Sequence, residues 1–121
     1  MFRFYNRNPK RKRAEDCVTR AISTVTGLNY EAITTLLQMT AEEYECPKLC
    51  VCCYHNLLEK ILHYECRYCS KSERVGDIAK RFRGEKVLIR IEGHLTCSMY
   101  GEVFDIWDCE DKIVDCYWII K

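Results

Sequence analysis

Hydrophobic residues in the first two thirds of the chain recur at helical spacing. The first stripe lies at i, i+3, i+4 and i+7 and consists of Val18, Ala21, Ile22 and Val25. This spacing predicts an amphipathic helix with one buried face. Asp16 is a favoured residue for capping the start of such a helix, and Gly27 is a favoured residue at its end. We therefore expect a helix from Cys17 to the neighbourhood of Gly27.

Further helical segments follow this one. Asn29 can cap a second helix, and its apolar stripe is Tyr30, Ile33, Leu36 and Leu37. Thr40 and Glu43 have the spacing of a capping box for another turn, and Pro47 breaks the pattern. From Leu49 onward a third stripe contains Tyr54, Leu57, Leu58, Ile61 and Leu62, and a short helix that ends at Gly84 contains Val75, Ile78, Ala79 and Phe82.

The last third of the chain changes to a period of two, which is typical of strands. In residues 86–92, KVLIRIE, the apolar residues Val87, Ile89 and Ile91 recur at every second position. Residues 94–100 and 102–108 are predicted to form a hairpin around Gly101, and residues 113–120 supply a final strand. Helices followed by an antiparallel sheet predict an α+β fold, and 121 residues suit a single domain, residues 1–121.

The charge distribution does not favour a nucleic-acid partner. The formal net charge is only +1, although residues 1–14 form a basic arm that contains Arg3, Arg7, Lys10, Arg11, Lys12 and Arg13. A run of this kind is usually solvated, and no recognised nucleic-acid module follows it. There is no apolar leader and no apolar run long enough to cross a membrane. We therefore expect a cytoplasmic protein whose ten cysteines form no structural disulfides.

Cys17 is a candidate nucleophile because of its place in the chain. A thiol in the first turn of a helix faces unpaired backbone N–H groups and the positive end of the helix dipole, which both favour the thiolate. The alternative is that Cys17 is a small buried apolar residue, as most free cysteines are. This stretch of sequence does not decide between the two interpretations.

His94 is a candidate catalytic base. A hairpin centred on Gly101 places His94 directly opposite Asp108, and opposed residues project from the same face of a sheet. A carboxylate there can hold one imidazole nitrogen while the other nitrogen faces a nucleophile. Asp105 has the opposite parity, but a turn shifted by one residue or a bulge would exchange the two aspartates. The alternative is that His94 merely starts a strand and both aspartates lie on the surface.

The middle of the chain offers a rival site. Its candidate zinc ligands are Cys46, Cys50, Cys52, Cys53, His55, His63, Cys66 and Cys69. Four soft ligands are enough for a structural zinc ion. The paired CxxC knuckles that mark such sites are absent, so the match is only partial, and some of these thiols are expected to pack in the core. We therefore expect no metal and no other cofactor.

Several short segments resemble known proteins in their order and spacing. They are YNRNP, DCVTRAI, GHL, FDIWD and the terminal YW, and together they are similar to a group of small, uncharacterised bacteriophage proteins. The order of a helix-start Cys, a strand-start His and a following acidic residue also resembles papain-like thiol proteases.

The resemblance implies a papain-like α+β fold in which N-terminal helices pack on a C-terminal antiparallel sheet. It implies that Cys17 is the nucleophile, His94 the general base, and Asp108 or Asp105 the orienting acid. Asn8 or Asn6, with the backbone N–H of Cys17, would bind the oxyanion.

Three functions are consistent with the sequence. The first is a phage-encoded thiol hydrolase that cleaves a peptide, isopeptide or related acyl bond, with a protein or peptide substrate in the host cytoplasm. The second is a non-enzymatic phage protein of the same fold that binds a host factor. The third is a small zinc-binding or nucleic-acid-binding module that uses the central cysteines and the basic arm.

Overall fold

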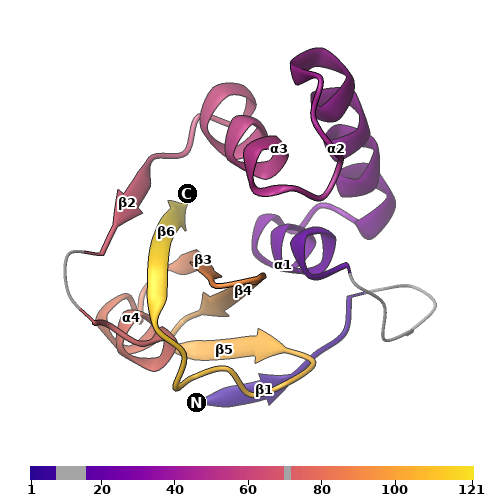
Figure 1. Ribbon diagram of the computed structural model, residues 1–121. Coiled ribbons are helices and arrows are strands. Elements are labelled where there is room, and N and C mark those ends of the chain that lie inside the picture. Colours follow the sequence, from indigo (N-terminus) through magenta and orange to yellow (C-terminus); the bar gives the residue numbers. More distant parts are fainter. Residues whose placement is uncertain (8–15, 70–71) are drawn as a thin grey trace.

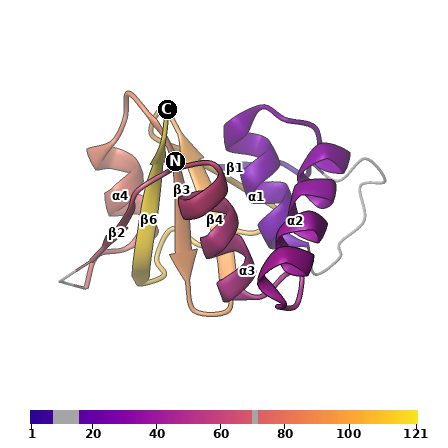
Figure 2. The ribbon, with the colours of Figure 1, turned by 90° about the horizontal axis from the view of Figure 1, so that it is seen from above.

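The structure, a computed structural model, describes residues 1–7, 16–69 and 72–121 and has an α+β architecture. In chain order its elements are β1 (Phe2–Phe4), α1 (Cys17–Thr26), α2 (Tyr30–Tyr44), α3 (Val51–Asn56), the π-helix η1 (Leu57–Ile61), β2 (Cys66–Tyr68), α4 (Val75–Arg81), β3 (Lys86–Ile91), β4 (His94–Met99), β5 (Glu102–Asp105) and β6 (Val114–Ile120). The sheet lies between two helical layers, with α1, α2 and α3 on one side and α4 on the other (Figures 1 and 2).

The six strands form one mixed sheet in the order β1-β5-β4-β3-β6-β2. The pairs among β3, β4, β5, β6 and β2 are antiparallel, as the period of two predicts, but β1 pairs with β5 in parallel. Within the segment described from the sequence as a basic arm, residues 2–4 form an edge strand beside β5 (Figure 1). The residues of that arm from 8 to 14 lie outside the described part of the chain.

The first helix begins and ends where its sequence pattern predicts. Gly27 closes α1 in the left-handed conformation, with a φ of 76°, and its N–H bonds to the carbonyl of Ser23. The start differs in its chemistry, because the Asp16 carboxylate makes no side-chain cap to α1 among the described residues. That carboxylate instead pairs with Arg20 and accepts a hydrogen bond from Tyr30.

The later helices confirm the stripes but correct their boundaries. Asn29 caps α2 by accepting a hydrogen bond from the Ala32 N–H at 2.7 Å. The capping box predicted at Thr40 and Glu43 is wrong, because α2 continues through both residues and Thr40 donates its hydroxyl to the carbonyl of Leu36. The stripe predicted from Leu49 is divided between α3 and the π-helix η1.

Two hydrophobic clusters hold the layers together. One lies between the sheet and α1, α2 and α3, and includes Ile22, Leu37, Leu58, Leu88 and Trp118. The other lies between the opposite face and α4, and includes Val75, Ile78, Val87, Ile89 and Ile119. Successive residues of β3 alternate between the clusters, as the pleat of a strand requires, so both faces of the central strand are buried. Within the described residues, no helix is long and apolar enough to span a membrane.

The β4–β5 hairpin has a different register from the predicted one. Met99 pairs with Glu102, so the turn consists of Tyr100 and Gly101 rather than Gly101 alone. Both turn residues have positive φ angles, 52° and 88°, which is the geometry that two-residue hairpin turns favour. This change of register moves Asp108 away from the position opposite His94. In this register the Asp105 side chain projects from the same face of the sheet as the His94 side chain.

Candidate active site

The end of the β4–β5 hairpin brings His94 and Asp105 into contact. His94 is the first residue of β4 and Asp105 is the last residue of β5. The ring Nε2 of His94 lies 2.6 Å from Asp105 Oδ2, and both side chains are largely buried. The other oxygen, Oδ1, accepts a hydrogen bond from the Ile106 N–H at 2.7 Å. Asp105 is thus fixed through both oxygens, and the imidazole is held by one nitrogen.

Cys17 meets the same imidazole from helix α1. Its half-buried thiol is hydrogen bonded to His94 and to the backbone N–H of Leu95. Since Nε2 faces Asp105, the thiol is left to interact with Nδ1. Burial opposes ionisation of Cys17, but these hydrogen bonds outweigh it and lower the pKa of the thiol below its ordinary value. The three predicted residue types therefore meet in the order nucleophile, imidazole, carboxylate.

The charge of the imidazole is stabilised in turn. Burial alone would lower the pKa of His94, but its hydrogen bonds with Asp105 and Cys17 raise that pKa to about 9. Burial likewise opposes ionisation of Asp105, and the hydrogen bond from His94 lowers the pKa of that carboxyl group. A thiolate, an imidazolium and a carboxylate can therefore coexist near neutral pH, which is the charge state needed for thiol nucleophilic catalysis.

Seven of the other cysteines have the opposite tendency. All ten lie within the described part of the chain, and none is in a disulfide there. Burial is the largest cause that raises the pKa of seven of them, which are Cys46, Cys53, Cys66, Cys69, Cys97, Cys109 and Cys116. These groups are held as thiols, whereas the environment of Cys17 favours the thiolate.

The Cys17–His94 pair opens on a cleft. One arm has a volume of about 370 Å³, and its walls include Leu49, Cys50, Val51, Tyr54 and Ile91. The other arm, of about 570 Å³, is bordered by Ile106 and Trp107. Gly93 borders both arms beside His94, and its φ of 69° is one that an L side chain rarely adopts. A reacting group thus has access to the thiol from two directions.

Trp107 was not singled out from the sequence, although it lies within the FDIWD segment. Its ring lies 5.0 Å from that of His94, centroid to centroid, at an interplanar angle of 53°. The indole is 39% exposed, so it covers one side of the imidazole while bordering the cleft.

Three further residues predicted for the site have different outcomes. Asp108 is exposed, and its Oδ1 accepts a hydrogen bond from the Glu110 N–H at 3.0 Å, so the placement opposite His94 is wrong. Asn6 is half-buried in the segment that follows β1. Asn8 lies outside the described residues.

The rival metal ligands are only partly brought together. Within the described residues, two groups of three ligand-type side chains have their ligand atoms within 4.8 Å of one another: His55, Glu59 and Cys66, and His94, Asp105 and Cys109. The second group shares two residues with the site above. In the first, His55 Nδ1 lies 2.8 Å from Glu59, while Nε2 lies 2.9 Å from the Arg90 guanidinium, which can only donate. A neutral imidazole can bind a metal through Nδ1 only when its proton is on Nε2. The Arg90 donor opposes that state, because it requires Nε2 to accept a hydrogen bond.

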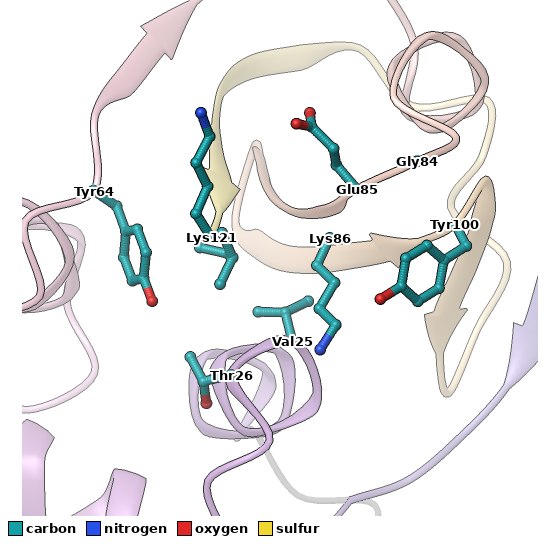
Figure 3. Close-up of a pocket in the computed structure, with 9 residues that line it drawn as sticks. Val25, Thr26, Tyr64, Gly84, Glu85, Lys86, Tyr100 and Lys121 are labelled. Carbon is teal, nitrogen blue, oxygen red and sulfur yellow. The ribbon is translucent and has the colours of Figure 1, made fainter.

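A separate pocket of about 400 Å³ lies at the other end of α1 (Figure 3). Tyr64 and Tyr100 direct their hydroxyl groups toward it from opposite sides, and Lys86 and Lys121 are among its lining residues. Among the described residues, its lining contains no cysteine or histidine, in contrast to the cleft at Cys17 and His94.

Comparison of the chain with protein-family models, with characterised proteins and with solved structures gave no match.

Proposed function

We propose that the protein is a thiol hydrolase of papain-like fold that cleaves a peptide, isopeptide or related acyl bond. The observation that carries this proposal is the sequence of contacts from Cys17 to His94 to Asp105 at the border of an open cleft. Geometry comes before pKa in judging a catalytic group, and here both favour the same residues. A protein or peptide substrate, with a host protein as one candidate, remains the class implied by the sequence resemblance.

The reaction would proceed in two steps. The Cys17 thiolate attacks the carbonyl carbon, and the Cys17 backbone N–H faces the oxyanion that develops. The imidazolium of His94 gives its proton to the leaving group as the carbon–leaving-group bond breaks, which leaves a thioester on Cys17. Neutral His94 then takes a proton from water, whose oxygen attacks the thioester and releases the acid. Asp105 orients the ring throughout and stabilises its positive form.

A generic acyl donor tests the proposal without knowledge of the natural substrate. We expect p-nitrophenyl acetate to release a burst of p-nitrophenolate and to leave an acetyl group on Cys17, which peptide mass spectrometry locates. Cys17→Ala should abolish the burst. Cys50→Ala is the matched control, because Cys50 is also half-buried and lines the same cleft.

The outcomes separate the alternatives. A burst that survives Cys17→Ala, or acetylation spread equally over Cys17 and Cys50, would contradict the hydrolase. A burst that is lost only with Cys17 supports it.

A further inference from the structure

A buried arginine lies behind the candidate active site. Arg20 is 6% exposed and sits on α1, one turn after Cys17. Its guanidinium pairs with the Asp16 carboxylate, and its Nη2 lies 3.9 Å from Asp105 Oδ1. Asp16 Oδ2 in turn accepts the Tyr30 hydroxyl proton at 2.6 Å. One cation is thus shared by two buried carboxylates.

We propose that Arg20 is a positioning residue for the reaction at Cys17. This inference rests on the proposed function, because it assigns a role in the same site. The guanidinium attracts the Oδ1 side of Asp105, which leaves Oδ2 directed at His94. Arg20 touches none of the reacting atoms in this arrangement, and it acts through Asp105.

The physical argument is the cost of buried charge. An ionised carboxylate in a buried position needs a paired charge or several hydrogen bonds, and removing one partner of a buried pair is strongly unfavourable. Without Arg20, each of the buried carboxylates of Asp16 and Asp105 would lose the guanidinium that it now faces. Each would then disfavour ionisation of the other. The negative charge that holds the imidazolium of His94 would weaken or turn away.

The orientation of Arg20 is itself fixed by its surroundings. Among the described residues, Asp16 before α1 and Asp105 on β5 face its guanidinium, Tyr30 on α2 holds Asp16, and Cys17 on α1 and Tyr5 after β1 line the same small cavity. The Tyr30 hydroxyl holds one oxygen of Asp16 and leaves the other for the guanidinium. A series of contacts therefore runs from Tyr30 on α2, through Arg20 on α1, to His94 on β4.

The test is the pH dependence of Cys17 alkylation by iodoacetamide, followed by mass spectrometry. In the folded protein, loss of Arg20 removes the positive charge beside Asp105 or lets Asp105 turn away from His94. Either effect disfavours the Cys17 thiolate. We expect Arg20→Gln to move the acidic limb of the profile up by about one pH unit, a tenfold slower reaction below that limb. Arg20→Lys keeps the charge, so its profile should lie close to that of the unmodified protein. Tyr30→Phe should produce a smaller shift of the same sign.

Arg90→Gln is the matched control, since it removes a half-buried cation that lies 3.7 Å from the Asp115 carboxylate and belongs to the other histidine cluster. Equal shifts in Arg20→Gln and Arg90→Gln, or an unshifted Arg20→Gln protein, would overturn the inference. If Arg20→Gln does not fold, an unshifted profile for Tyr30→Phe would overturn it instead. Ordinary Cys17 reactivity in the unmodified protein would contradict the hydrolase proposal itself, whereas activated Cys17 with unshifted variants contradicts only the role of Arg20.

Discussion

His94 and His55 have similar surroundings at first sight. Each is half-buried, each lies within 2.8 Å of a carboxylate oxygen, and each belongs to a group that contains a cysteine. The difference is in the second partner of each ring. That partner is the Cys17 thiol for His94, whereas it is the Arg90 guanidinium, at Nε2, for His55.

The pKa values of the two rings shift in opposite directions. The pKa of His94 is raised to about 9, because hydrogen bonds to Asp105 and Cys17 overcome burial. The pKa of His55 is lowered, first by burial and then by the Arg90 cation, and Glu59 does not compensate. An imidazole beside a carboxylate and a cysteine is therefore not sufficient for thiol chemistry, since the remaining nitrogen must face the thiol.

The largest expected effect separates the two histidines directly. His94→Ala should lower the rate of p-nitrophenyl ester hydrolysis on the order of a hundredfold or more, because proton transfer and thiolate stabilisation are both lost. His55→Ala should change that rate less than about twofold, since its ring is not part of the Cys17 contacts. Stopped-flow measurement of both variants, with circular dichroism to verify folding, checks this. Similar losses in the two would remove the distinction.

The two aspartates give the next largest difference. Asp105→Asn keeps an acceptor for the ring but removes the charge that helps raise the pKa of His94, so that pKa should fall from about 9 toward its ordinary value. The alkaline limb of hydrolysis, where the imidazolium loses its proton, should therefore move down by about one to two pH units. Asp108→Asn should leave the profile unchanged. A profile altered only by Asp108→Asn would restore the register predicted from the sequence.

A smaller effect is expected for the pKa of His55. Arg90→Gln removes a cation that disfavours protonation of His55, so the pKa of that ring should rise. The rise should stay below about one unit, because burial is the larger cause and remains in place. Titration of the ring C–H signals by NMR measures it, with His94 in the same spectrum as an internal reference. A fall in the pKa of His55 would contradict the assignment of Arg90 as its partner.

Most of the helices and the main strands could be predicted, because each is encoded by local periodicity. The stripe after Asp16 and the alternation in residues 86–92 both correspond to buried faces of observed elements. Strands β1 and β2 could not be found this way, because three residues are too few to show a period. Their pairing depends on partners about a hundred residues away for β1 and about fifty for β2.

The site was predictable in its residue types but not in its register. Cys17 and His94 were identified from their positions at the start of a helix and of a strand. The choice between Asp105 and Asp108 depended on whether the turn contains one residue or two, and Tyr100 gives no sequence signal for the positive φ that it adopts. Arg20 was also missed. Its helical position is compatible with a solvated face, and only tertiary packing places two carboxylates around it.

The smallest expected effect is that of metal removal. His55, Glu59 and Cys66 form the candidate zinc group, but Arg90 donates toward Nε2 of the ring, which leaves the proton of a neutral imidazole on Nδ1. Zinc at Nδ1 would have to displace that proton and also turn Nε2 into a donor facing the guanidinium. Elemental analysis of the purified protein should therefore find far less than about one zinc per chain, and EDTA should leave the melting temperature unchanged. Stoichiometric zinc with a lower melting temperature after EDTA would show that the metal displaces the Arg90 hydrogen bond. His55 would then be a metal ligand, in contrast to His94 as a catalytic base.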